Sequence, residues 1–198
     1  TDPGPRITRC IQYALERLDE EVLPAEELLW CIGPPLLHSF EQLVGEERAS
    51  QAVHLYRERF GDVRLFENAV YDGIPASLEH LKQSHLELYV ASSKPLVYVK
   101  RILEHFSLMR FFDDVFGSEL DGTRTDKTEL LAYALKNTAY EPGRCAMIGD
   151  RHHDMLGARN NAMQGTGVLY GYGTREELSG AGASRLAHEP CDLVSLHL

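Results

Sequence analysis

The chain has 198 residues, of which 43% are hydrophobic and 25% are charged, with a formal net charge of −10 and a pI near 5.3. This length suits one buried domain, or one domain with a modest insertion. The acidic balance argues against a basic surface for a nucleic-acid backbone or an anionic membrane, so we expect neither as a partner. A small anionic ligand is still compatible, because it needs only a few local donors or a metal ion.

Residues 7–60 show helical periodicity without a strand pattern. One apolar stripe contains Ile7, Ile11, Leu15 and Leu18, and part of another contains Ala52, Leu55, Tyr56 and Phe60. A Gly-Pro-Pro sequence at residues 33–35 interrupts the pattern, and a proline suits the first turn of a new helix. This region therefore predicts a small all-helical unit.

From Tyr71 onward, short apolar strands alternate with amphipathic helices. We expect helices over residues 75–83, 95–105, 126–136 and 154–162, a short helix from Thr174, and strands over residues 86–91, 115–116, 145–148 and 167–169. Such alternation predicts parallel strands buried on both faces, and therefore an open α/β sheet. Ligands of these sheets bind at the carboxyl ends of the strands, so polar residues that follow strands are the candidates for a site.

The first candidate cluster is Ser92-Ser93-Lys94-Pro95, directly after the strand over residues 86–91. Hydroxyl and free backbone N–H groups at a helix start suit an anion such as phosphate. The alternative is that a serine only caps the helix that follows.

The second candidate is Lys127, at the start of a predicted helix. A cation at the positive end of a helix dipole is unfavourable, so its position calls for an anionic partner. Asp126 is one possible partner, and a solvated surface lysine is the simpler alternative.

The third candidate cluster follows the strand over residues 145–148. Asp150 and Asp154 lie four residues apart across a strand end and a helix start, and their oxygens suit Mg²⁺. The alternative is that both carboxylates serve the helix N-terminus. His152 and His153 lack the ligand spacing of a zinc site, so we expect exposed or lining residues. The pair Asp113-Asp114 precedes a strand and predicts a turn at the opposite edge of the sheet.

The order and shared placement of these clusters predict that they converge on one pocket for a metal and a phosphate. At these positions the chain resembles the haloacid dehalogenase superfamily, and within it the phosphoglycolate phosphatase-like group. Ser92 matches that family's second motif, Lys127 its third, and Gly149-Asp150 with Asp154 its fourth. Residues 32–36 resemble the group's helical-cap signature.

The resemblance implies an α/β fold with a Rossmann-like parallel sheet, formed by residues 1–8 and 71–198, and an all-helical cap domain over residues 9–70. It also implies a magnesium-dependent phosphomonoester hydrolase that acts on a small phosphorylated metabolite through an aspartyl-phosphate. In this scheme Ser92 and Ser93 bind the phosphoryl group, Lys127 offsets charge on the nucleophile and the phosphoryl group, and Asp150 with Asp154 binds Mg²⁺. The family's nucleophile motif, Asp-x-Asp-Gly-Thr, is not in this chain, so we expect a strand and this motif before Thr1.

Two departures bear on the substrate: Thr128-Glu129 follows the motif lysine in place of the group's usual proline, and Ser93 stands where asparagine is common. The alternatives are a nucleotide monophosphatase, a mutase or dehalogenase on the same fold, or a non-catalytic phosphate- or metal-binding remnant if the polypeptide begins at Thr1. A dehalogenase is disfavoured because it has no use for paired magnesium ligands.

The four cysteines, at positions 10, 31, 145 and 191, form no CxxC pair, so we expect buried thiols and a cytoplasmic protein. No apolar stretch reaches the length of a membrane span, and the opening residues do not form a signal peptide. No pattern indicates an oligomeric state.

Overall fold

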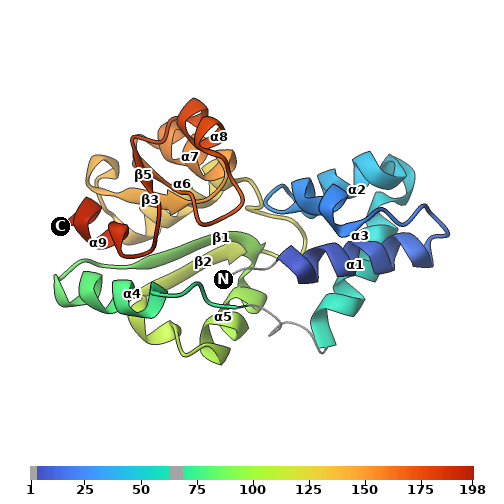
Figure 1. Ribbon diagram of the computed structural model, residues 1–198, viewed down its shortest axis with the longest axis horizontal. Helices are drawn as coiled ribbons and strands as arrows, with labels where there is room; N and C mark the ends of the chain where they lie inside the picture. Colours follow the sequence, from blue (N-terminus) through green and yellow to red (C-terminus); the bar gives the residue numbers. More distant parts are fainter. Residues whose placement is uncertain (1–3, 63–68) are drawn as a thin grey trace. The chain divides into compact units, whose positions relative to one another are not determined.

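The computed structural model describes residues 4–62 and 69–198. The chain divides into two compact units, residues 1–70 and residues 71–198 (Figure 1). Residues 4–8, which the sequence analysis assigned to the α/β core, instead form the start of the first helix of the helical unit. Residues 1–3 of that assignment lie outside the described residues.

Every element that the structure describes in the first unit is a helix. Its elements are α1 (Gly4–Arg17), the 3-10 helix η1 (Ala25–Cys31), α2 (Leu36–Val44) and α3 (Glu46–Asp62). Pro35 is the N-cap of α2, as the sequence predicts. The expected stripe on α1 is buried, because Ile7, Ile11, Leu15 and Leu18 face the inside of this unit.

Aromatic side chains fill the centre of the helical unit. Phe40 on α2 is fully buried and meets Tyr56 of α3 edge to face, with ring centroids 6.2 Å apart. Tyr56 in turn stacks on Phe60 at 5.3 Å. Such pairs add specific geometry to the burial of apolar area, so they fix how α2 and α3 pack on each other.

The second unit alternates strands and helices, which confirms the predicted α/β fold. Its helices are α4 (Ile74–Gln83), α5 (Leu96–His105), α6 (Lys127–Thr138), α7 (His152–Asn160), α8 (Arg175–Ala181) and α9 (Asp192–His197). Short 3-10 helices occur at Met109–Phe111 and Pro142–Arg144. Its strands are β1 (Tyr89–Pro95), β2 (Asp114–Ser118), β3 (Ala146–Gly149), β4 (Gln164–Val168) and β5 (Arg185–Ala187).

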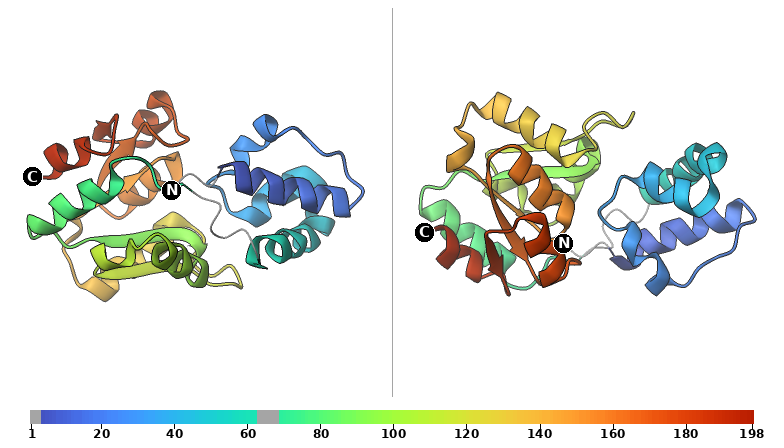
Figure 2. Two further views of the ribbon diagram at one scale, coloured as in Figure 1. Left: turned by 60° about the horizontal axis from the view of Figure 1, so that its bottom comes forward. Right: turned by 90° about the horizontal axis from the view of Figure 1, so that it is seen from above.

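All strand pairs among these elements are parallel. β1 pairs with β2, and β3 pairs with β4, which pairs with β5 (Figure 1). Helices α4 and α9 lie side by side (Figures 1 and 2). One apolar cluster joins Leu81 of α4 to Val168 of β4, Ala187 of β5 and Leu193 of α9, with Ile148 of β3 packed against it. This cluster ties the first helix of the unit to its second sheet.

The strands differ in burial. Apart from its first residue, each of β2 and β4 is buried along its length. Every residue of β1 is only half-buried, and so are the last three residues of β3. Among the described strand pairs, β4 is the one strand with a partner on both sides, whereas β1, β2, β3 and β5 each stand at a sheet edge.

Several boundaries differ from the sequence prediction. The strand expected over residues 86–91 lies at Tyr89–Pro95, with a register irregularity between Ser92 and Pro95. The helix expected from Asp154 begins at His152, because the Asp154 carboxylate accepts from the N–H of Arg151, the N-cap residue, and so closes the first turn. β5 and α9 were not predicted, since a three-residue strand and a six-residue helix carry little periodicity.

The four thiols are free, as expected, but they differ in burial. Cys10 and Cys31 are buried, Cys145 is half-buried and Cys191 is exposed. No helix within the described ranges combines the length and apolar character required to cross a bilayer.

The helical unit supplies a stability prediction. Phe40→Ala should lower the free energy of unfolding by about 3–5 kcal/mol, because it opens a cavity beside Tyr56. Leu37→Ala is the matched control on the same helix, since Leu37 is 45% exposed. The chain's single tryptophan is Trp30, so urea unfolding followed by tryptophan fluorescence reports on this unit. Equal losses for the two variants would contradict the assigned core.

Candidate active site

The second half of β1 places Ser92 close to neighbouring backbone groups. Ser92 pairs with Gly117 of β2, and its Oγ accepts a hydrogen bond from the Lys94 N–H at 3.2 Å. The carbonyl of Ser93 accepts from Ser118 Oγ at 2.9 Å. The N-cap of α5 is Pro95, so Ser92 is not the cap of that helix.

Lys127 is the first residue of α6 and is 9% exposed. Its ammonium donates to the carbonyl of Ala91, the neighbour of Ser92, at 2.9 Å and lies 2.9 Å from Asp154 Oδ1. Asp126, the partner considered from sequence, is engaged elsewhere, because its carboxylate caps α6 by accepting from the Glu129 N–H at 3.0 Å. The anionic partner of Lys127 is therefore Asp154, which belongs to another helix.

Asp154 is held on two sides. One carboxylate oxygen pairs with Lys127, and the other accepts from the Arg151 N–H at 3.2 Å. The carboxylate also lies against the backbone of Gly149, where an added Cβ would be 2.4 Å from Asp154 Cγ. Only glycine fits this position, since contacts this short do not occur between real side chains and their neighbours.

Asp150 is fixed by the segment after β4. Its Oδ2 accepts from the Tyr172 N–H at 2.9 Å, and a Cβ added to Gly171 would lie 2.3 Å from the Cβ of Asp150. Burial raises the pKa of Asp150; the Tyr172 N–H acts in the opposite direction, and the negative charge of Asp154 adds to the rise. Two carboxylates that repel each other in a largely buried place favour the arrival of a cation.

The ligand atoms of Asp150 and Asp154 suit Mg²⁺ better than Zn²⁺. Asp150 and Asp154 offer hard oxygen ligands, and within the described ranges no third Asp, Glu, His or Cys ligand atom gathers with theirs. Mg²⁺ tolerates so few protein ligands because it keeps several waters. His152 Nδ1 lies 2.9 Å from Glu177 Oε1, which leaves that nitrogen engaged with a carboxylate.

The sequence analysis missed Glu177. Its Oε1 accepts from Arg151 Nε and from the His152 N–H, each at 2.9 Å, and lies 2.9 Å from His152 Nδ1. Burial opposes its ionisation, but the hydrogen bonds from His152 and Arg151 lower the pKa of Glu177 to about 2. In sequence, Thr174-x-x-Glu177 is typical of a local helix cap, so no pattern pointed to a contact with residues 151–152.

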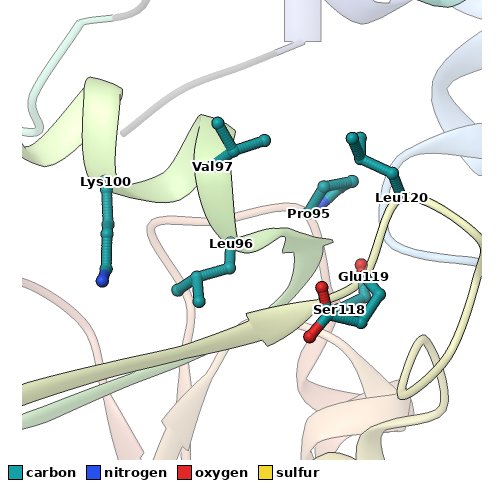
Figure 3. Close-up of a pocket in the computed structure, with 7 residues that line it drawn as sticks. All are labelled: Pro95, Leu96, Val97, Lys100, Ser118, Glu119 and Leu120. Carbon is teal, nitrogen blue, oxygen red and sulfur yellow. The ribbon is translucent and has the colours of Figure 1, made fainter.

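A hollow of about 350 Å³ lies at the carboxyl ends of β1 and β2 (Figure 3). Its lining is Pro95, Leu96, Val97, Lys100, Ser118, Glu119 and Leu120. The apolar members come mainly from the start of α5, while Ser118 and Glu119 follow β2. The hollow therefore adjoins the segment that carries Ser92.

The structure links the second and third predicted clusters through Lys127, which also contacts Ala91, the residue directly before the first cluster. Lys127 contacts the backbone beside Ser92 and the carboxylate of Asp154, and Asp154 acts electrostatically on Asp150. Asp113 lies at the other end of β2, where it pairs with Lys82 at 2.6 Å.

Three comparisons with known proteins bear on this site. A 5'-nucleotidase of Pseudomonas aeruginosa is 46% identical over 198 residues, which are 99% of this chain and 88% of that protein. Phosphoglycolate phosphatase 1 of the same organism is 26% identical over 129 residues, 65% of this chain and 47% of that protein. The crystal structure of a predicted phosphatase from Clostridium acetobutylicum matches with a TM-score of 0.94 and 40% identity, and the match covers 100% of this chain and 93% of that one.

The model of the haloacid dehalogenase-like hydrolase family matches residues 2–168, which is most of the chain. That range holds the Ser92 segment, Lys127, Asp150 and Asp154, whose geometry is described above. The chain therefore belongs to the haloacid dehalogenase-like hydrolase family.

Proposed function

We propose that this protein is a magnesium-dependent phosphatase that hydrolyses a nucleoside 5'-monophosphate. The observation that carries the proposal is the position of Lys127, whose buried ammonium bonds both the end of β1 and the carboxylate of Asp154. One cation thus joins the hydroxyl segment to the paired carboxylates. A phosphate bound beside Ser92 and a metal ion bound by Asp150 and Asp154 would both lie near Lys127.

In this proposal each residue has one task. Ser92 Oγ and nearby N–H groups donate to a phosphoryl oxygen, with Ser93 beside it. Lys127 stabilises negative charge that builds on the transferring group, and such preorganised donors act most strongly where water is excluded. Asp150 and Asp154 hold Mg²⁺, which when bound neutralises charge on the phosphate oxygens.

The nucleophile is an aspartate that precedes Thr1. It attacks phosphorus and releases the alcohol, and water then hydrolyses the aspartyl-phosphate to inorganic phosphate and free carboxylate. A second aspartate of the same motif protonates the leaving oxygen and later takes a proton from the water. The half-buried strands β1 and β3 support this proposal, because each has a sheet edge that a further parallel strand could cover.

The choice of substrate rests on the relatives. The 5'-nucleotidase matches nearly the whole chain at 46% identity, whereas the phosphoglycolate phosphatase matches 65% of it at 26%. We therefore place a nucleotide ahead of phosphoglycolate, which the sequence analysis put first. The net charge of −10 supports a small phosphorylated metabolite over nucleic acid or a membrane, and the free thiols support a cytoplasmic location.

The first test is phosphate release by the full-length protein, including any residues before Thr1. We expect hydrolysis of nucleoside 5'-monophosphates to exceed that of phosphoglycolate, and a chelator to abolish the activity until Mg²⁺ is restored. A colorimetric assay of inorganic phosphate over a panel of phosphomonoesters measures both. Unchanged activity after chelation would refute the metal role, and a preference for phosphoglycolate would refute the substrate alone.

Lys127→Met tests the proposed charge stabilisation. We expect kcat to fall by about 10²–10³, the usual loss when one preorganised donor to the transition state is removed. Lys136→Met removes an exposed lysine from the same helix and should leave kcat unchanged. Circular dichroism should first show that Lys127→Met is folded, because Asp154 loses its partner. A folded variant with normal kcat would exclude the role.

Asp150→Asn separates stability from metal binding. The amide keeps an oxygen acceptor for the Tyr172 N–H but removes the repulsion with Asp154, so the metal-free variant should have a higher Tm than the wild type. Mg²⁺ at 100 times its Kd should stabilise the wild type by about 2.7 kcal/mol, and this gain should be lost in the variant. Thermal unfolding in chelator and in Mg²⁺ gives both values. An equal Mg²⁺-dependent rise in Tm for both proteins would remove Asp150 from the ligand set.

A further inference from the structure

Glu177 forms an unusual convergence of hydrogen bonds. A single oxygen, Oε1, accepts from Arg151 Nε and the His152 N–H and lies 2.9 Å from His152 Nδ1. These groups are distant in sequence from Glu177, which stands on α8, whereas Arg151 is the N-cap of α7 and His152 is its first residue. We call these two residues the Arg151-His152 turn. The carboxylate thus holds both the backbone and the side chains of that turn.

The same turn determines where the two aspartates lie. Asp150 directly precedes it, and Asp154 closes it by accepting from the Arg151 N–H at 3.2 Å. Arg151 is therefore held at two points, by Asp154 through its backbone and by Glu177 through its side chain. A shift of this residue would change the separation of Asp150 and Asp154.

Glu177 stands at the position in α8 from which its carboxylate could complete a capping box, but the carboxylate binds other groups. Thr174 is the N-cap of α8, and its Oγ1 accepts from the Glu177 N–H at 3.1 Å, which is one half of a capping box. In a complete box, the glutamate would accept from the backbone N–H of the N-cap residue. Here it accepts from Arg151 and His152 instead, and its low pKa keeps it ionised at neutral pH.

We propose that Glu177 is a positioning residue that fixes the Arg151-His152 turn so that Asp150 and Asp154 are preset for Mg²⁺. This inference rests on the proposed metal site. Glu177 does not touch the ion in this scheme. It acts through Arg151, whose side chain it binds and whose backbone N–H bonds the ligand Asp154, and so restricts the orientations that this ligand can take.

The test measures Mg²⁺ binding directly, by isothermal titration calorimetry of the full-length protein. Glu177→Ala should raise the Kd for Mg²⁺ by about tenfold or more, as is typical when an outer-shell partner is removed. Glu177→Gln keeps an acceptor oxygen but not the charge, so its Kd should lie between those of the wild type and the alanine variant. Glu176→Ala and Glu176→Gln are matched controls, since Glu176 is exposed in the first turn of the same helix, and their Kd should equal that of the wild type.

Kinetics give a second readout that a loss of general stability would not produce. The Mg²⁺ concentration for half-maximal activity should rise in Glu177→Ala, while kcat at saturating Mg²⁺ should return close to the wild-type value. A Kd within twofold of wild type in folded Glu177→Ala, or an equal loss in Glu176→Ala, would overturn the inference. If Glu177→Ala does not fold, a Glu177→Gln variant that binds Mg²⁺ as Glu176→Gln does would overturn it as well.

The two proposals fail in different ways. A wild-type protein that binds no Mg²⁺ would overturn the proposed function, and this inference with it. A wild-type protein that binds Mg²⁺ and hydrolyses nucleotides, together with a Glu177→Ala variant of equal affinity, would overturn only the role of Glu177.

Discussion

The buried ion pair between Lys127 and Asp154 is the interaction on which the site depends. Both side chains lie almost wholly inside the α/β unit, where an unpaired charge would carry a large desolvation penalty. The pair therefore constrains α6, α7 and the end of β1 at once, because Lys127 also bonds the carbonyl of Ala91. Elements that are far apart in sequence are held in one arrangement by a requirement of electrostatics, in addition to apolar packing.

Around this pair, carboxylates are buried at a desolvation cost, and backbone N–H groups hold them in place by hydrogen bonds. Asp150 is kept in position by the Tyr172 N–H and Asp154 by the Arg151 N–H, while Glu177 restrains the turn between them. The burial of apolar side chains in two clusters of this unit offsets the free-energy cost of burying these carboxylates. Local departures from the most stable arrangement are typical of functional sites and are offset elsewhere in a fold.

The alternation of elements and the helical stripes followed from the sequence because both are periodic over many residues. The expectation that Ser92, Lys127, Asp150 and Asp154 converge came from one rule, that polar residues after parallel strands lie at one edge of the sheet. The sequence did not identify Asp154 as the partner of Lys127, since only the neighbouring Asp126 was considered and Asp154 lies on another helix. Glu177 was not found, because Thr174 and Glu177 together fit a local cap and the contact with Arg151 spans 26 residues. The assignment of residues 1–8 to the core came from the family resemblance, whereas in the structure α1 already begins at Gly4.

The absence of a side chain at Gly149 has an evolutionary consequence. An added methyl group would occupy the space of the Asp154 carboxylate, so every other amino acid there would displace the partner of Lys127. Selection should therefore reject substitutions at Gly149, although glycine contributes no side-chain group to the site. A descendant of this protein could change Gly149 only together with Asp154, and hence only by abandoning the ion pair that organises the site.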